Sequence, residues 1–257
     1  MTVIEVAPLR EDEVHVRIAS LDCPQSEMKY FENILADDEI NRANRFHFRK
    51  DRERFVARRG LLRMILSSYL GMPANEIIFT YGCHGKPGLR RQDSRPNIEF
   101  NLGHSGGTAI YAITQDRAVG VDIESVQAGF PVEDVAKNFF SVAEISALQA
   151  LPITLRTEAF FKCWTRKEAF IKALGDGLSF PLSNFDVSLM PGQPARLLHV
   201  RGPSEEPSRW YMEDIDSVAG SAAALVFSGP QCRMHITKWD TKAGTDELVL
   251  GMHRGVD

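Results

Sequence analysis

The order of secondary-structure elements expected in this 257-residue chain recurs once, after roughly 105–115 residues. Each occurrence has a helical pattern closed by a glycine, then a short strand, then a hairpin that ends in an apolar strand. The helices end at Gly71 and Gly175, the short strands cover 77–80 and 185–189, and the hairpins end with 108–113 and 221–227. Because the sequence identity between the two occurrences is slight, the repeat indicates a shared architecture more than shared side chains. We predict an α+β fold of two similar halves, residues 1–117 and 118–257.

The remaining elements follow from periodicity and from start and stop residues. A capping box of Ser141 and Glu144 predicts the start of a helix over 141–150. Further helices are expected over 36–71 as one continuous stretch, over 131–140 and over 155–174. Further strands are expected over 98–102, 118–124 and 209–216. Segments 190–208 and 240–257, rich in Pro, Gly and polar residues, are expected to form a loop and a loose tail.

Composition narrows the function classes. The net charge is 30 − 34 = −4, the pI is about 6.0 and 44% of residues are hydrophobic, so a globular enzyme or binding module is favoured over a nucleic-acid binder. The N-terminus shows no signal-peptide pattern, and no apolar stretch approaches the ~20 residues that span a bilayer. The four cysteines form no CxxC pair. We expect a cytoplasmic protein that binds neither nucleic acid nor membrane.

Two clusters could bind a metal ion. Asp122 and Glu124 share one face of a strand, because alternate residues point the same way. Trp164, Glu168 and Lys172 are four residues apart and form one stripe of a helix. Paired carboxylates repel unless a cation lies between them, and hard oxygen ligands favour Mg²⁺. The alternatives are an exposed acidic strand end, and a core Trp beside a surface Glu–Lys pair.

Two further segments could bind phosphate. In the turn after the strand 98–102, Gly103, His104 and Ser105 combine small residues with donors, and Gly103 to Gly107 also matches the G-x-S-x-G nucleophile elbow of hydrolases. That motif needs a following helix, whereas the next residues favour a strand. The second segment, from Arg42 to Arg63, holds eight Arg and one Lys against two acids. Its alternative interpretation is a solvated helix face.

In this order, the motifs resemble the 4′-phosphopantetheinyl transferases of the Sfp type, the surfactin-synthetase-activating group. The matching stretches are GKP at 85–87, FNLGHS at 100–105, GVDIE at 120–124, FFSVAEISAL at 139–148 and WTRKEAFIKALGDGLSFPLSNFDVSL at 164–189. The resemblance covers roughly residues 40–190 and is most specific in the combination of GVDIE with the later W-x-x-K-E-x-x-x-K. One departure is Gly103, where the family usually has Ser or Thr.

The resemblance implies transfer of the phosphopantetheine arm of coenzyme A to a serine of an apo acyl or peptidyl carrier protein, releasing adenosine 3′,5′-bisphosphate. It also implies a cleft between the two halves and a monomer. By resemblance, the site residues are Asp122, Glu124 and Glu168 on Mg²⁺; Lys167 and Lys172 on the pyrophosphate; His104 and Ser105 on coenzyme A phosphates; Lys86 and Pro87 along the nucleotide; and Arg45, Arg49 or Arg54 at the 3′-phosphate.

For catalysis we expect Asp122, Glu168 and Lys172 to act together. Glu168 is the first candidate for the base that takes the serine proton, with a metal-bound water as the alternative. Two other functions stay open at this point: a non-catalytic coenzyme A or carrier-protein binding module, and a serine hydrolase that uses Ser105. Whether the carrier serves fatty acid, polyketide or nonribosomal peptide synthesis is open as well.

Overall fold

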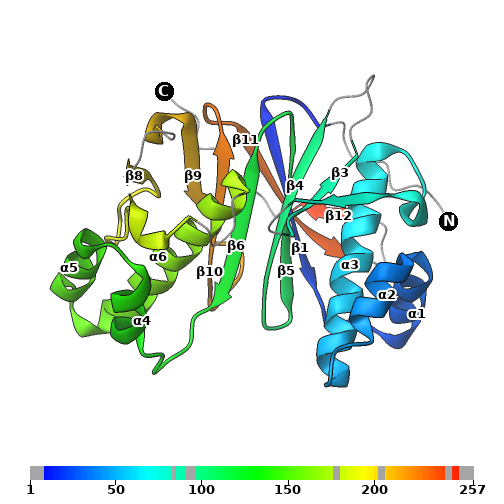
Figure 1. The fold of residues 1–257 in the computed structure, drawn as a ribbon, viewed down its shortest axis with the longest axis horizontal. Coiled ribbons are helices and arrows are strands. Elements are labelled where there is room, and N and C mark those ends of the chain that lie inside the picture. The colour runs from blue at the N-terminus through cyan, green and yellow to red at the C-terminus, as the bar shows by residue number, and fades with distance from the viewer. Residues whose placement is uncertain are drawn as a thin grey trace.

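The fold consists of two sheets packed face to face, with a layer of helices on each outer side (Figure 1). The computed structural model describes residues 9–82, 85–90, 97–175, 180–201, 206–240 and 245–248. One outer layer holds α1 (Gln25–Ile34), α2 (Asp37–Ala43) and α3 (Arg49–Leu70). The other holds α4 (Val132–Phe139), α5 (Val142–Ala150) and α6 (Ile153–Leu174). The predicted α+β fold of two halves is confirmed.

The first sheet has five strands in the order β12-β11-β1-β5-β4. Their bounds are β1 (Glu13–Ser20), β4 (Ile98–Ser105), β5 (Thr108–Gln115), β11 (Arg233–Asp240) and β12 (Thr245–Leu248). β1 pairs with β11 in parallel, and the other neighbours are antiparallel. The sheet therefore places a strand from near the N-terminus beside one from near the C-terminus.

The second sheet has three antiparallel strands in the order β6-β10-β9. They are β6 (Val119–Ser125), β9 (Trp210–Asp214) and β10 (Ser221–Ser228). Two small ribbons complete the described strands: β2 (Phe79–Tyr81) with β3 (Pro87–Leu89), and β7 (Phe185–Val187) with β8 (Leu197–Val200). Short 3₁₀ turns lie at Ala74–Glu76, Leu182–Asn184 and Pro207–Arg209.

Three apolar clusters fill the spaces between the four layers. The central cluster joins the two sheets and includes Val119, Val121 and Ile123 of β6, each at most 1% exposed. Because side chains alternate along a strand, Asp122 and Glu124 face the other way, as the sequence predicted. The central core thus fixes the side of β6 on which the carboxylates lie.

Several details of the sequence prediction were wrong. The helical stretch 36–71 is broken, because Phe48 adopts an extended conformation (φ −93°, ψ 135°) between α2 and α3. Segment 190–208 contains β8, and segment 240–257 contains β12. Strands β1 and β11 were not predicted at all. The boundary at residue 117 stays a prediction: it separates β5 from β6, yet β11 and β12 return to the first sheet.

The capping box at the start of α5 is confirmed. Glu144 N donates to Ser141 Oγ at 3.2 Å, and Ser141 N donates to Glu144 Oε2 at 3.0 Å. No helix within the described residues is long and apolar enough to cross a bilayer.

Candidate active site

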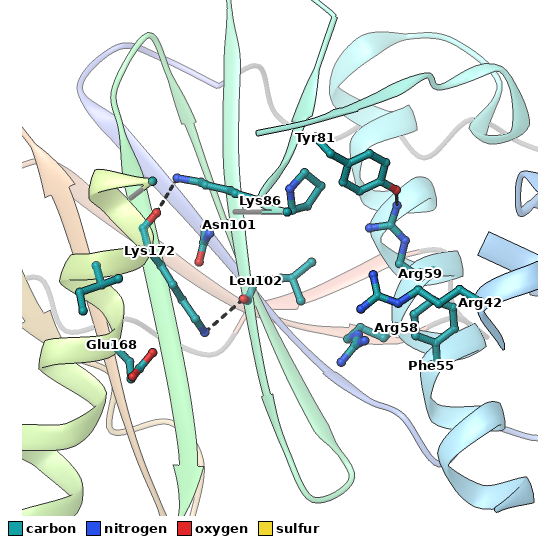
Figure 2. A pocket seen from close by; sticks show the side chains of 14 residues that line it. Arg42, Phe55, Arg58, Arg59, Tyr81, Lys86, Asn101, Leu102, Glu168 and Lys172 are labelled. Carbon is teal, nitrogen blue, oxygen red and sulfur yellow. Dashed lines mark hydrogen bonds between the residues drawn. The ribbon is translucent and has the colours of Figure 1, made fainter. Parts of the chain in front are cut away.

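A cleft of about 280 Å³ opens between the two halves (Figure 2). Both helical layers, the end of β2, the start of β3 and the middle of β4 contribute to its walls. The lining residues are Arg42, Phe55, Arg58, Arg59, Tyr81, Gly85, Lys86, Pro87, Asn101, Leu102, Glu168, Ile171, Lys172 and Gly175. Arginines lie on one side and Glu168 with Lys172 on the other, so the cleft suits a ligand that has anionic groups at both ends.

Close backbone packing brings the predicted carboxylates to one region. A Cβ on Gly120 would lie 2.0 Å from the Ala169 carbonyl oxygen and 2.4 Å from Ala173 N, so only glycine lets α6 rest directly on β6. Asp122 follows two residues later on β6, and Glu168 immediately precedes Ala169 on α6. The predicted convergence of strand and helix therefore depends on this glycine.

The carboxylates of Asp122, Glu124 and Glu168 influence one another electrostatically, although one oxygen from each does not come within 4.8 Å of the others. Burial, and next the charge of Asp122, raise the pKa values of both Glu124 and Glu168. Asp122 is 5% exposed, and burial raises its pKa although Lys172 opposes that shift. Its Oδ2 is buried and accepts no hydrogen bond from the described residues. This donor set fits a hard divalent cation such as Mg²⁺.

Lys172 connects the three backbones that meet at the site. Its ammonium donates to Asp122 Oδ1 at 2.7 Å and to the carbonyl oxygens of Val121 at 3.2 Å and Leu102 at 3.5 Å. The side chain reaches these groups from α6 while remaining 29% exposed (Figure 2). Lys172 therefore neutralises part of the carboxylate charge and still has an exposed side toward the cleft.

Ser105 contacts the Glu124 carboxylate and does not lie in the backbone context of a nucleophile elbow. Its hydroxyl donates to Glu124 Oε2 at 2.9 Å and accepts from Ser125 N at 3.0 Å. The following residues turn back as β5, so the G-x-S-x-G match lies in a strand–turn–strand hairpin. The hydrolase alternative requires a strand–turn–helix and is not supported.

Comparison with known proteins identifies the family. The sequence model of the "4'-phosphopantetheinyl transferase, N-terminal" family matches residues 22–116, and that of the "4'-phosphopantetheinyl transferase superfamily" matches residues 118–226. The 4'-phosphopantetheinyl transferase HetI of Nostoc sp. is 40% identical over 189 residues, which cover 74% of this chain and 79% of that protein. The chain belongs to the 4′-phosphopantetheinyl transferase family. It is thus an enzyme of the transferase class.

Other relatives are more distant. The 4'-phosphopantetheinyl transferase Sfp of Bacillus subtilis is 32% identical, with 64% of this chain and 71% of that protein covered. The human L-aminoadipate-semialdehyde dehydrogenase-phosphopantetheinyl transferase is 29% identical, with 70% and 62% covered. The transferase family is shown by these matches, whereas membership of the Sfp type is not.

Lys167, expected at the pyrophosphate of this transferase, lies in the core instead. Its ammonium is fully buried, pairs with Glu144 Oε2 at 2.7 Å and donates to the carbonyl oxygens of Leu182 at 2.8 Å and Phe185 at 2.6 Å. The reason is helical geometry: residue 167 points about 100° away from its neighbour Glu168. The expected phosphate contact is therefore corrected to a structural ion pair.

Three arginines expected at the 3′-phosphate lie outside the cleft lining. Arg54 forms a two-point pair with Asp22 at 2.7 and 2.8 Å, and Arg49 pairs with Glu53 at 2.7 Å. Arg45 is exposed and does not line the cleft.

Arg42 and Arg58, which the sequence analysis did not single out, line the cleft instead. Desolvation lowers the pKa of Arg58, and the nearby charges of Arg59 and Arg42 lower it further, whereas Tyr111 acts in the opposite direction. The signal that could have found Arg58 is its position three residues after Phe55, on the buried face of α3.

Lys86 and Pro87 lie in the cleft lining, and His104 lies on β4 outside it. Lys86 and Pro87 line the cleft, but the Lys86 ammonium donates to the carbonyl oxygens of Lys172 at 2.6 Å and Val119 at 3.2 Å. His104 is exposed, and partial desolvation with the charges of Arg58 and Lys172 lowers its pKa to about 4. His104 is therefore neutral at pH 7.

The alternative interpretation of Trp164 as a core residue holds. Its ring packs against Phe139, Phe140 and Phe160. Glu168 and Lys172, one and two turns further along α6, leave this core and line the cleft. The three residues of the predicted stripe therefore divide into a core anchor and two site residues.

Proposed function

We propose that this enzyme, as a transferase of the Sfp type, moves the 4′-phosphopantetheine arm of coenzyme A to a serine hydroxyl of an apo acyl or peptidyl carrier protein. Adenosine 3′,5′-bisphosphate is the second product, and the reaction depends on Mg²⁺. The observation that carries the proposal is a group of three carboxylates beside an arginine-lined cleft, in which Asp122 raises the pKa values of the other two and keeps one oxygen without a hydrogen bond in the described residues.

In this proposal Asp122, Glu124 and Glu168 hold the metal. When bound, Mg²⁺ neutralises charge on the pyrophosphate as the phosphoryl group is transferred. Ser105 keeps Glu124 oriented through its hydroxyl, and the Ser125 amide keeps that hydroxyl oriented in turn. The donor set is thus held in place by the protein itself.

Lys172 and Glu168 carry the chemical step in this proposal. Lys172 supplies a fixed positive charge where negative charge grows on the oxygens of the attacked β-phosphorus and the leaving group. Glu168 accepts the proton of the carrier serine hydroxyl, and its raised pKa brings it closer to the value that suits a general base near neutral pH. Metal binding to Glu168 would reverse part of that rise.

The nucleotide end of coenzyme A lies toward α2 and α3 in this proposal. Arg42 and Arg58 offer guanidinium groups to phosphate, and Phe55 offers an apolar ring between them. Arg59 is less available because Glu39 Oε1 accepts from it at 2.5 Å and Tyr81 also binds it. We therefore assign the 3′-phosphate to Arg42 and Arg58.

The test is incubation of an apo carrier protein with coenzyme A and Mg²⁺, followed by intact mass measurement. The carrier should gain one phosphopantetheine arm, and Glu168→Gln should remove the gain. Glu158→Gln is the matched control, because Glu158 lies on the same helix with its side chain 62% exposed. No gain with any carrier of a fatty acid, polyketide and peptide panel, or full activity of Glu168→Gln, would overturn the proposal.

The same assay separates the remaining alternative. A non-catalytic binding module would bind coenzyme A or the carrier while the carrier mass stays unchanged. A monomer in a reducing cytoplasm belongs to this proposal as well. The reducing compartment is supported by Cys23, Cys163 and Cys232, which are free thiols; Cys83 lies outside the described residues.

A further inference from the structure

A second cluster of metal-ligating groups lies on the first sheet. Glu13 and His15 are alternate residues of β1, and His235 of β11 is the direct neighbour of His15 in the parallel register. All three side chains therefore lie on one face of the sheet, and one ligand atom from each lies within 4.8 Å of the others. None of the three lines the cleft.

Each imidazole approaches a different oxygen of the Glu13 carboxylate, at a distance close to that between two ligands of a small metal ion. His15 Nε2 lies 3.5 Å from Glu13 Oε2, and His235 Nε2 lies 3.6 Å from Glu13 Oε1. Ligand atoms about 2.0–2.2 Å from a tetrahedral Zn²⁺ are separated by roughly 3.3–3.6 Å. His235 Nε2 is buried and has no hydrogen-bond partner in the described part of the chain, so a ligand would satisfy it.

The surroundings prepare His15 for ligation. Its Nδ1 lies 2.8 Å from the hydroxyl of Tyr69 on α3, which fixes the ring and directs Nε2 toward the cluster. His15 is 4% exposed and Glu13 is 7% exposed, so both are held by packing.

Two neighbouring cations limit which metal can bind. Arg233 Nη2 lies 3.4 Å from Glu13 Oε1 but also pairs with Asp12 at 2.7 Å, so it keeps a partner when Glu13 turns to a metal. Arg17 Nη2 lies 3.4 Å from His15 Nδ1, and Arg17 donates from Nη1 to Thr237 at 2.8 Å. With one carboxylate, two imidazoles and two arginines nearby, the site disfavours Mg²⁺ and Ca²⁺ and favours Zn²⁺.

We propose that Glu13, His15 and His235 form a Zn²⁺ site, with a fourth position open to water, which fastens β11 to β1. Because β1 comes from near the N-terminus and β11 from near the C-terminus, one ion would join the two ends of the described fold. The proposed role is structural and independent of the proposed transfer reaction, because none of the three residues lines the cleft.

The test is titration of the chelator-treated full-length protein with Zn²⁺ in the presence of excess Mg²⁺, followed by calorimetry and thermal unfolding. One equivalent should bind and raise the Tm, and Co²⁺ in its place should give the strong visible absorption of a tetrahedral site. His235→Ala should weaken Zn²⁺ binding by at least about tenfold and abolish the Tm rise. The side chain of His235 is 42% exposed, so the variant should fold.

Three further variants complete the test. His199→Ala removes an exposed histidine of β8 and should bind Zn²⁺ as the unaltered chain does. Glu13→Gln keeps the shape of the side chain and should also weaken binding. Asp122→Asn removes a carboxylate of the cleft and should leave Zn²⁺ binding intact. The proposal is overturned if Zn²⁺ does not bind, if His235→Ala and Glu13→Gln bind it normally, or if Asp122→Asn abolishes binding.

Discussion

Replacing Gly120 by alanine should separate α6 from β6 and thereby disable the site. The new Cβ would lie 2.0 Å from the Ala169 carbonyl oxygen, whereas real Cβ contacts stay above 3.0 Å. The helix and the strand must therefore move apart by about 3.0 − 2.0 = 1.0 Å, because both clashing groups are backbone and cannot rotate away. Glu168, next to Ala169, would move away from Asp122 by a similar amount.

Two effects of different size should follow. Overpacking of this kind costs about 1–3 kcal/mol of unfolding free energy. A misplacement of about 1 Å in a reacting constellation costs about 100-fold in turnover, so activity should fall far more than stability. Urea unfolding measures the loss of stability, and carrier mass gain against time measures turnover of the folded variant.

Gly88→Ala is the matched control, because its Cβ would come no closer than 3.4 Å, to the side chain of Thr80. This variant should keep both turnover and stability. If Gly120→Ala is folded and retains turnover within about twofold, the contact of α6 with β6 does not set the distance between the carboxylates, and the role assigned to Gly120 is refuted.

Four other variants test the site and the core beside it. Lys167→Met should cost about 3–5 kcal/mol of unfolding free energy, since it leaves a buried Glu144 unpaired, whereas Lys172→Met should lower turnover about 100-fold with a smaller stability loss; urea unfolding and turnover distinguish them. Gly103→Ser should cost about 1–3 kcal/mol and slow turnover, because its Cβ would lie 3.0 Å from the Asp122 Cα; wild-type stability would contradict this. His104 has a folded pKa of about 4, below its unfolded value, so the unfolded state binds more protons and stability should fall as pH drops from about 6.5 toward 4; His104→Gln should flatten that fall in urea titrations.

The parts of the fold that sequence reasoning found are those whose signals are local. The capping box at Ser141 and the glycine stop at Gly175 depend on neighbouring residues alone, and both begin or end a helix as expected. Strands β1 and β11 escaped prediction because their pairing partner lies at the other end of the chain. In β1 the charged and polar residues Glu13, His15 and Arg17 are buried, so the expected alternation of apolar and exposed residues is not visible as such.

In the site, too, the features predicted from the sequence are those that depend on local spacing. The sequence predicted Asp122 and Glu124 on one face of a strand because they are two residues apart, and Glu168 on the helix stripe that it shares with Trp164 and Lys172. Lys167 was predicted at the pyrophosphate, which was wrong, because a motif match gives only the order of residues. Neighbouring residues of a helix point about 100° apart. The sequence of an arginine-rich segment does not show which of its arginines faces a cleft. Here Glu53 pairs with Arg49 and Asp22 pairs with Arg54, and the second pair forms only in the tertiary fold.

The glycines explain why the carboxylate site can exist in this fold. Three backbones meet at Asp122: β4 approaches at Gly103, and α6 approaches β6 at Gly120. Such close approach puts the carboxylates where water cannot reach them freely, which raises their pKa values and leaves Asp122 Oδ2 unsatisfied. Without a bound cation, replacing a carboxylate by an amide removes the free-energy cost of burying its charge. Asp122→Asn should therefore stabilise the metal-free protein while removing activity, and a loss of stability in urea unfolding would mean that Lys172 alone already compensates the buried charge.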